Sequence, residues 1–469
     1  MHNEVEFDHK HSYFLADNYK QKQQIIVSPY SNSSNTIYIM IQSGFIAVID
    51  LGTSKITGIV GRKNENNVIS VLASETIPSN RCIRRGLIYN IEETGAKVRK
   101  LISLLENKLS RKIGKVYVSV AGQSIHSITH SVSKQLSSSG IVTDNVIDQM
   151  RKEAEKFMPE MSKRYDIADV EYIINDKSES QPVGVTTSQI EARYQMVVGR
   201  PNIITNIEKS IKGKANLEIA GYVVGPLASA SISLNENEKE LGCAFIDFGA
   251  GTTSLSIYKG GKLRYLVVIP FGGATITQDI CDLNFIETDA ELYKIKFGKT
   301  HEIPETGFFN SFASKPDIDL PSLNHVIEMR LQEIIDNVAE QIRISGYQGQ
   351  LGAGLVITGG ASQLKNMPEF LEDKLNMPVR KASARKTSIN NSPDLANDPS
   401  MTQALGLLLF GWDNCEEQVV VQPVEEQVEV EEPVKEKKPK NPIKKRGAGF
   451  FNKVENMFGG MFEDEDDDN

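Results

Sequence analysis

The chain has 469 residues, enough for about three domains, and its 40% hydrophobic content allows sizeable cores. Its net charge of −9 argues against a general nucleic-acid-binding protein, and four scattered cysteines without a CxxC pair exclude a zinc knuckle or disulfide scaffold and fit a reducing compartment. The sequence has no run of eighteen apolar residues and no signal-peptide pattern at its start, so we expect no membrane-spanning helix.

Residues 1–43 are polar and show no period, so we expect either a disordered extension or a functional start at Met40. After them, apolar runs alternate with amphipathic stretches, which predicts an α/β fold. Strands are predicted at 45–50, 56–60, 116–120, 243–248, 253–258, 263–269 and 354–358, and helices at 95–109, 145–158 and 325–344. His126 and His130 share one face of a strand-like stretch, and we favour sheet histidines over a metal site there.

Two segments share one local plan, AVIDLGTSKITGIV at 47–60 and AFIDFGAGTTSLSIY at 244–258. Each apolar strand ends on an aspartate, Asp50 or Asp247, turns through glycine and hydroxyl residues, and resumes as a strand. Such turns let backbone N–H groups approach phosphate oxygens, while the carboxylates can hold Mg²⁺ through water. The turn residues are Gly52, Thr53 and Ser54 in the first copy, and Gly249, Gly251, Thr252 and Thr253 in the second.

A third glycine element, LVITGGASQL at 355–364, places Gly359 and Gly360 after an apolar strand. Glycines there would let an adenine or a ribose lie flat against the backbone. Two similar hairpins about two hundred residues apart predict an internally duplicated fold with a cleft between its halves.

DLGTSK, DFGAGTT and ITGGAS, in this order, resemble the phosphate and adenosine motifs of the actin-like ATPases. Within them the chain resembles the FtsA family of bacterial cell-division proteins over about 44–412 and again over 444–462. The resemblance implies ATP and Mg²⁺ as ligands and connecting helices near 226–234 and 400–411. The resemblance also implies that Lys55 binds the nucleotide. Through the segment AELYKIKFG it implies the same role for Glu291 and Lys294.

The fold that the resemblance implies is the α/β, ribonuclease H-like duplicated fold of the actin-like ATPases, with an inserted subdomain called 1C and a C-terminal amphipathic helix. We expect an extension at 1–43; subdomain 1A at 44–86, 169–230 and 386–412; 1C at 87–168; 2A at 231–285 and 351–385; 2B at 286–350; a disordered linker at 413–442; a membrane-targeting helix at 443–462; and an acidic tail at 463–469.

The C-terminal segment predicts an interfacial helix, because its apolar side chains fall on one arc and cations precede them. The cations are Lys444, Lys445 and Arg446, and the apolar residues are Phe450, Phe451, Val454, Met457, Phe458, Met461 and Phe462. The alternative is a helix that packs on the protein's own core. Gly459, Gly460 and the acidic tail predict a weak, reversible anchor whose binding several subunits would multiply.

The stretch from Gly225 to Ala230 offers only a serine where faster relatives carry a carboxylate or an amide. We therefore expect tight ATP binding with slow or negligible turnover, and the alternative is that Asp50 or Asp247 activates water through Mg²⁺. No residue is assigned a catalytic role.

The resemblance implies a polymerising protein, peripheral on the cytoplasmic face of the inner membrane at the division septum. Its implied partners are the FtsZ C-terminal tail at 2B, other copies of itself, later division proteins at 1C and an anionic membrane, with no nucleic acid. Rival readings are a pilus-assembly ATPase, a small-molecule kinase and a chaperone ATPase of the same superfamily.

Overall fold

A computed structural model describes residues 44–137, 140–300 and 319–417 of the chain. The predictions for residues 1–43, for the linker beyond Glu417, and for the C-terminal helix and acidic tail lie outside these ranges. Within them, no helix is long and apolar enough to cross a lipid bilayer.

The first sheet has five strands in the order β11-β6-β1-β2-β3. The strands β1, β2 and β3 are antiparallel neighbours, while β6 and β11 add parallel strands at the other edge. Their bounds are β1 Ile46–Leu51, β2 Lys55–Lys63, β3 Ile69–Pro78, β6 Lys115–Val120 and β11 Glu218–Val224. All six residues of β1 are buried, as the apolar run predicts.

The second sheet repeats this plan in the order β16-β15-β12-β13-β14. Again three antiparallel strands, β12, β13 and β14, are followed by two parallel ones, β15 and β16. Their bounds are β12 Cys243–Phe248, β13 Thr253–Lys259, β14 Lys262–Ile269, β15 Leu355–Thr358 and β16 Val379–Lys381. The expected internal duplication is therefore present, and we call the two halves the first and second lobes.

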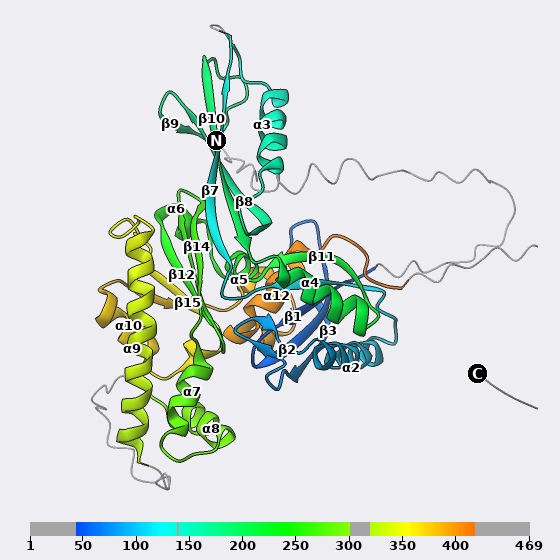
Figure 1. Ribbon diagram of the computed structural model, residues 1–469, viewed down its shortest axis with the longest axis vertical. Coiled ribbons are helices and arrows are strands. Elements are labelled where there is room, and N and C mark those ends of the chain that lie inside the picture. Colours follow the sequence, from blue (N-terminus) through cyan, green and yellow to red (C-terminus); the bar gives the residue numbers. More distant parts are fainter. Residues whose placement is uncertain (1–43, 138–139, 301–318, 418–469) are drawn as a thin grey trace, which may run out of the picture. The chain divides into compact units, whose positions relative to one another are not determined.

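A separate group of elements extends the second sheet beyond β14 (Figure 1). It consists of β7 His126–Gln135, α3 Asp144–Lys156, β8 Lys163–Ile174, β9 Lys177–Glu179 and β10 Gln189–Gly199. It has its own core, which includes the buried side chains of Met150, Ala154 and Tyr194. We call this group the insert.

The predicted limits of the insert, 87–168, need correction. The helix α2 (Ile91–Leu109) and the strand β6 lie in the first lobe, whereas β10 pairs with β7 and β8 along its whole length. The group with a core of its own therefore runs from His126 to Gly199. The error arose because β6 pairs with β1, which lies far away in the sequence.

The insert meets the second lobe along a seam between β7 and β14. Only one backbone pair, Val267 with His126, joins the two strands in register. Side chains of β8 also reach β14: Arg264 forms a two-pronged ion pair with Glu171 at 2.7 and 2.9 Å, and Asp169 Oδ2 accepts the Leu263 N–H at 2.8 Å. These contacts make part of the seam polar, while Val197 of the insert and Leu263 and Leu266 of β14 belong to one apolar cluster.

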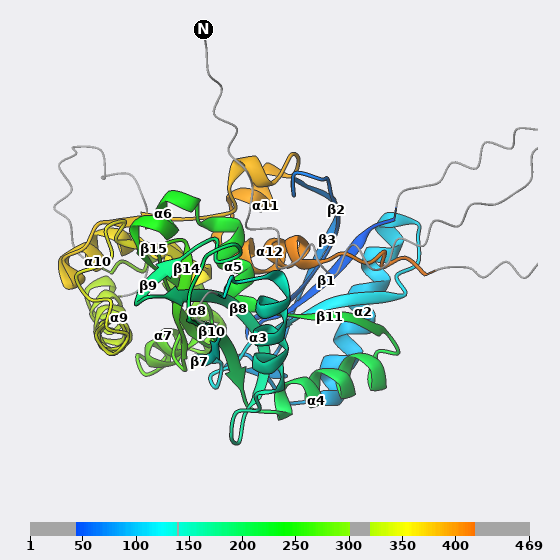
Figure 2. The same cartoon turned by 90° about the horizontal axis from the view of Figure 1, so that it is seen from above.

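Three helices shape the first lobe and its junction with the second. Helix α2 packs on β2 and β3, and Gly58 makes room for it, since a Cβ there would lie 2.7 Å from Leu105 Cδ1. Helices α5 (Gly225–Ser233) and α12 (Thr402–Phe410) lie side by side in Figures 1 and 2. They match the two predicted connecting helices, and α5 also contacts β12 and β13 of the second lobe.

The second lobe carries α7 (Gly273–Cys281), α8 (Glu287–Phe297), α9 (Leu320–Ile344) and α10 (Met367–Leu375). In α9 every residue of the predicted apolar stripe is buried, namely Ile327, Leu331, Ile334, Ile335, Val338 and Ile342. The shorter elements are β4 Ile83–Arg84, β5 Leu87–Ile88, α4 Asn202–Glu208, a π-helix Lys209–Lys214, α6 Glu236–Leu241, α11 Pro393–Asn397, and 3₁₀ turns at Gly360–Gln363, Lys386–Ser388 and Pro399–Met401.

Residues 413–417, expected at the start of the disordered linker, instead lie along the first lobe. Cys415 is fully buried and its N–H donates to the Phe45 carbonyl at 2.8 Å. Glu416 pairs with Arg111 and forms a β-bridge with Ile113. The prediction of a linker from 413 was therefore wrong for these five residues.

Candidate nucleotide site

The first predicted hairpin forms as a tight turn between β1 and β2. Asp50 pairs with Thr57 and Leu51 with Ile56, which leaves Gly52 to Lys55 at the turn. A Cβ on Gly52 would lie 2.6 Å from the Lys55 carbonyl oxygen, so the turn closes only with glycine there.

The second hairpin repeats the first in detail. Asp247 pairs with Ser254, and a Cβ on Gly249 would lie 2.9 Å from the Thr252 carbonyl oxygen. The hairpin is braced from outside, because the Gly273 and Ala274 N–H groups donate to the Gly249 and Ala250 carbonyls at 2.9 and 2.8 Å. The two turns therefore have the same construction.

The two hairpins face each other. A Cβ on Gly251 would lie 2.8 Å from Thr53 Cγ2 and 2.9 Å from Thr53 Cβ. Thr53 is itself fixed, since its hydroxyl accepts the Gly86 N–H at 3.0 Å and its carbonyl accepts the Ser79 hydroxyl. The two glycine-rich turns, predicted to face each other, are thus in contact in the described structure.

Both strand-end carboxylates lie deep at this junction. Burial, together with the negative charge of Asp50, raises the pKa of Asp247 to about 6, against the hydrogen bond from Ser229. Burial also raises the pKa of Asp50, against hydrogen bonds from Gln403 and Ser119 and the charge of Lys55. Two buried carboxylates that repel each other form a site that a cation would stabilise.

A side chain from each connecting helix contacts one of these carboxylates. Ser229 of α5 donates to Asp247 Oδ2 at 2.7 Å, and Gln403 Nε2 of α12 donates to Asp50 Oδ1 at 2.5 Å. The predicted serine is therefore used in the site as a hydrogen-bond donor. Gln403 was not among the predicted residues.

Lys294 and Glu291 form a compact cluster with α7. Lys294 Nζ donates to the Gly273 carbonyl, Thr277 Oγ1 and Glu291 Oε2 at 2.8, 2.7 and 2.6 Å. Burial lowers the pKa of Lys294, although the Glu291 carboxylate opposes this effect. The cluster adjoins the second hairpin through Gly273, and the nucleoside contact of Glu291 and Lys294 stays a prediction.

The predicted adenosine glycines differ in what surrounds them. Gly359 has φ of +89°, and a Cβ there would lie 2.5 Å from the Phe248 carbonyl oxygen, beside the second hairpin. Gly360 has only the Ser400 Cβ within 4 Å, at 3.7 Å. The backbone conformation at Gly359 therefore requires glycine, whereas the space beside Gly360 is not filled by other protein atoms.

Thr253, a predicted phosphate ligand, is placed differently from the expectation. Thr253 is fully buried and donates its hydroxyl to the Phe271 carbonyl at 2.9 Å, so it is not available to a phosphate. Lys55 Nζ lies 2.8 Å from Ser400 Oγ, toward the start of α12. Ser54 is exposed at the tip of its hairpin.

The site fits Mg²⁺ held mainly through water and phosphate. No group of three or more His, Cys, Asp or Glu side chains with metal-ligand geometry occurs in the described ranges, at His126 and His130 or elsewhere. Mg²⁺ needs fewer protein ligands, because it keeps several waters and binds through one or two carboxylates plus substrate phosphates. Asp50 and Asp247 would supply those carboxylates, and the facing hairpins would supply N–H groups for phosphates.

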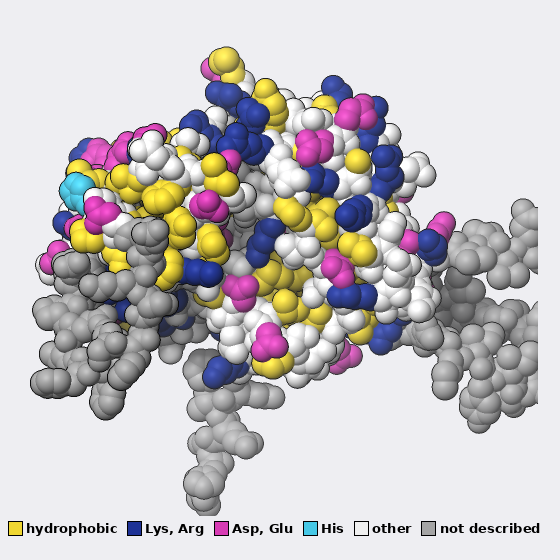
Figure 3. Space-filling view, turned by 90° about the horizontal axis from the view of Figure 1, so that it is seen from below, with side chains coloured by type: hydrophobic (Ala, Val, Ile, Leu, Met, Phe, Trp, Pro, Cys, Tyr) yellow, Lys and Arg dark blue, Asp and Glu magenta, His cyan; other side chains and the backbone are white. Residues whose placement is uncertain are grey.

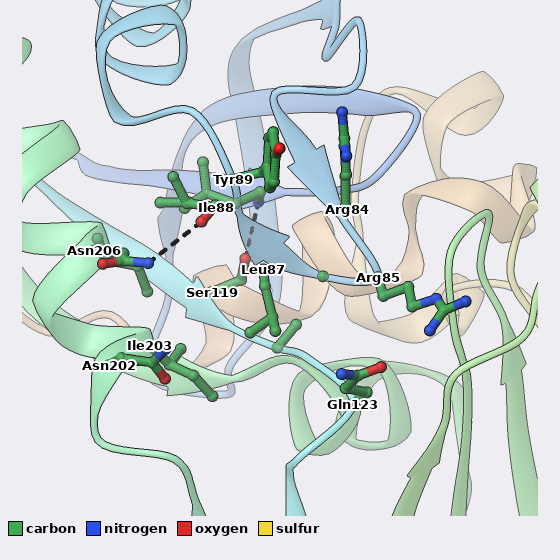
Figure 4. Close-up of a pocket in the computed structure, with 14 residues that line it drawn as sticks. Arg84, Arg85, Leu87, Ile88, Tyr89, Ser119, Gln123, Asn202, Ile203 and Asn206 are labelled. Carbon is green, nitrogen blue, oxygen red and sulfur yellow. Dashed lines mark hydrogen bonds between the residues drawn. The ribbon is translucent and has the colours of Figure 1, made fainter.

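A groove of about 490 Å³ lies beside this cleft, between β4–β5, the end of β6 and α4 (Figure 4). Its wall is partly apolar, from Leu87 and Ile203, and partly cationic, from Arg84 and Arg85. None of the predicted nucleotide-binding residues lines it. The groove nevertheless adjoins the first hairpin, because Leu51 and Gly86 line it and the Gly86 N–H donates to Thr53.

Comparison with known proteins shows similarity to FtsA cell-division proteins and to a pilus-assembly protein. The model of "Cell division protein FtsA" matches residues 244–406, and that of "Type IV pilus assembly protein PilM" matches 48–315. The FtsA of Porphyromonas gingivalis is 31% identical over 81% of this chain and 79% of its own length. The FtsA of Pseudomonas aeruginosa is 30% identical over 79% of this chain and 90% of its own length. The FtsA of Escherichia coli is 25% identical over 77% of this chain and 89% of its own length.

The solved structure of a PilM–PilN type IV pilus biogenesis complex is also similar, with a TM-score of 0.55 and 16% identity over 78% of this chain and 98% of the other. This likeness concerns the fold. Together with the repeated sheets and the facing hairpins, it shows the α/β fold of the actin-like ATPases.

Proposed function

Since the chain belongs to the FtsA family of cell-division proteins and has the actin-like fold, we propose that it binds Mg-ATP between the two hairpins, polymerises and tethers the FtsZ ring to the membrane. It would act as a peripheral protein on the cytoplasmic face of the inner membrane at the septum. The helix at 443–462 would supply the membrane contact, and the insert would recruit later division proteins.

The observation that carries the nucleotide part is the contact of Gly251 with Thr53. It brings two glycine turns of the same construction together, with Asp50 and Asp247 behind them. One triphosphate could then be held from both sides by N–H groups while Mg²⁺ offsets the two buried carboxylates.

The side chain that α5 places at the two carboxylates supports slow ATP turnover. Its one polar side chain at the carboxylates, Ser229, already donates to Asp247. A serine held in this way is a poor general base. Bound nucleotide would then act mainly as a ligand that favours one conformation or the filament.

Sedimentation with anionic liposomes, with and without Mg-ATP, tests the tether. The full chain is compared with a chain that ends at Pro442 and so lacks Lys444–Arg446 and the apolar arc. We expect the full chain to pellet with lipid, more strongly with Mg-ATP because filaments multiply weak contacts, and the shorter chain to stay soluble. If both chains stay soluble, the tether is wrong, and a pilus-assembly role becomes the better reading of the PilM match.

The second lobe offers an apolar surface for the FtsZ tail. On α8 and the residue before it, Ile286, Leu292 and Ile295 are exposed, and Met329 is exposed on α9. Figure 3 shows hydrophobic side chains gathered on this face of the molecule. Ile286 and Ile295 expose 67% and 70% of their surface, which is unusual for isoleucine and favours a surface that a partner covers.

The substitution Ile295→Asp should weaken binding of an FtsZ C-terminal peptide at least tenfold, measured by fluorescence anisotropy. Leu241→Asp on α6 is the matched control, since Leu241 is 59% exposed and lies outside α8 and α9. Equal binding by the two variants would remove α8 from the proposed FtsZ contact.

A further inference from the structure

Gln403 lies at the one place where the first aspartate, α12 and the start of α5 meet. Its Nε2 donates to Asp50 Oδ1 at 2.5 Å, across 353 positions of sequence. On the other side, a Cβ on Gly225 would lie 2.5 Å from Gln403 Oε1 and 2.7 Å from Gln403 Cδ. Glycine at the first residue of α5 therefore leaves the room that the glutamine amide fills.

The backbone that carries Gln403 is itself firmly held. Thr402, the preceding residue, is buried and donates its hydroxyl to the Pro399 carbonyl at 3.0 Å. Helix α12 packs closely on α5, because a Cβ on Gly406 would lie 2.5 Å from the Ala228 carbonyl carbon. The amide is thus presented to Asp50 from a rigid element rather than from a loop.

The bond to Gln403 has a consequence for the orientation of Asp50. A carboxylate can rotate about its terminal bond with little restriction. A donor at 2.5 Å on Oδ1, together with the hydrogen bond from Ser119, fixes that rotation. On the opposite strand end, Ser229 constrains Asp247 through Oδ2. Each lobe's aspartate is therefore oriented by a side chain from a different connecting helix.

We propose that Gln403 is a positioning residue that orients the Asp50 carboxylate toward the metal ion of a bound nucleotide. This rests on the proposed Mg-ATP function and adds a residue to that site. Gln403 acts through Asp50, so its loss should reduce the contribution of Mg²⁺ to nucleotide affinity and leave metal-free affinity nearly unchanged. Loss of a side chain that hydrogen-bonds to a metal ligand commonly lowers metal affinity by about 10–100-fold.

The test compares ATP affinity in Mg²⁺ with ATP affinity in EDTA, by titration of a fluorescent ATP analogue into the full chain. The variant Gln403→Met keeps the length of the side chain and removes the amide. The control Gln332→Met removes another amide–carboxylate hydrogen bond, from Gln332 Nε2 to Asp336 Oδ1 at 2.7 Å, on the surface of α9. Melting curves of all three chains without nucleotide show whether they are folded.

We expect the ratio of ATP affinity in Mg²⁺ to ATP affinity in EDTA to fall at least tenfold in Gln403→Met. The ATP affinity of this variant in EDTA should stay within threefold of that of the unchanged chain. The control Gln332→Met should keep the ratio of the unchanged chain. An unchanged ratio in a folded Gln403→Met chain overturns the proposal. If that chain also loses ATP turnover while the ratio is unchanged, Gln403 orients the attacking water instead. A Gln403→Met chain that does not fold is replaced by Gln403→Asn, which keeps the amide but shortens its reach and should show the same fall. If the unchanged chain binds nucleotide with no metal dependence, the metal role of Asp50 itself is wrong.

Discussion

Thr53 of the first hairpin lies against Gly251 of the second, so closely that a Cβ on the glycine would overlap the threonine side chain. The contact joins two lobes whose hairpins are about two hundred residues apart in sequence. It sets the separation of the two turns, and through them the separation of any N–H groups that would hold a phosphate.

The substitution Gly251→Ala should therefore weaken ATP binding. An added methyl group must push Thr53 or the second hairpin away, and both are fixed by hydrogen bonds to neighbouring segments. We expect at least a tenfold rise in Kd, measured by titration with a fluorescent ATP analogue.

Gly213→Ala is the matched control for this variant, because the nearest atom to an added Cβ there is the Glu208 carbonyl oxygen at 4.0 Å. It should bind ATP normally. If Gly251→Ala also binds ATP with unchanged affinity, the two hairpins do not clamp the triphosphate.

Asp247 should make stability depend on pH when no metal is present. Its pKa is raised to about 6 in the folded chain, whereas an ordinary aspartate titrates near 3.8, so the folded state binds more protons between about pH 4 and 6. Stability should fall as pH rises through that window and then stay level. Asp247→Asn removes the buried charge and should stabilise the chain at pH 7.5 in EDTA by about 1–3 kcal/mol.

The same substitution should have little effect on stability at pH 4.5, where most folded chains already carry the proton. Urea unfolding of both chains at the two pH values measures the difference. A stabilisation of equal size at both values would show that the charge of Asp247 is not the cause.

The seam between the insert and the second lobe should depend on the pair formed by Arg264 and Glu171. Both side chains are largely buried, and the carboxylate makes two hydrogen bonds with the guanidinium, which lowers the pKa of Glu171. Glu171→Arg and Arg264→Glu should each destabilise the chain and raise amide exchange in β7 and β14, while the double exchange restores part of the loss. We expect a coupling energy of about 1–3 kcal/mol from urea unfolding of the four chains.

A coupling energy near zero would mean that this ion pair contributes little to holding the insert on the second lobe. Arg343→Glu with Glu340→Arg serves as the comparison pair, since these residues of α9 form an exposed ion pair at 2.6 Å. Their coupling should be smaller than that of the seam.

Gly406 should be intolerant of any side chain. An added Cβ would lie 2.5 Å from the Ala228 carbonyl carbon, so Gly406→Ala must separate α12 from α5. The expected loss of stability is about 2 kcal/mol or more, despite the higher helix propensity of alanine. Thermal unfolding of this chain and of Gly213→Ala measures it, and an unchanged Tm for Gly406→Ala would show that the two helices can move apart freely.

Local patterns predicted the hairpins and α9 well, because each depends on residues close together in sequence. The run Cys243–Phe248 forms β12 with the predicted bounds, and the stripe on α9 is wholly buried. The glycines of both turns are placed as their steric role requires. The repeated hairpins also predicted the duplication of the sheets.

Features that depend on distant partners were missed. The limits of the insert depend on β6 pairing with β1 and on β10 pairing with β7. The strand β10 was missed although its sequence QIEARYQMVVG alternates apolar and polar residues. Thr253 looked like a phosphate ligand until its hydroxyl was placed against Phe271. Gln403 carried no local signal, since its partner Asp50 lies at the other end of the described chain.

The end of α12 has a practical consequence. Trp412 is the one tryptophan of the sequence, it follows α12 by two residues, and Lys63 Nζ lies 3.4 Å from its ring centre. Lys63 also donates to the Leu409 carbonyl at 2.6 Å, which connects β2 of the first hairpin to the end of the helix that carries Gln403. Intrinsic emission excited at 295 nm therefore comes from a single known position, and any shift of that helix against the first hairpin can be followed optically in the unlabelled protein.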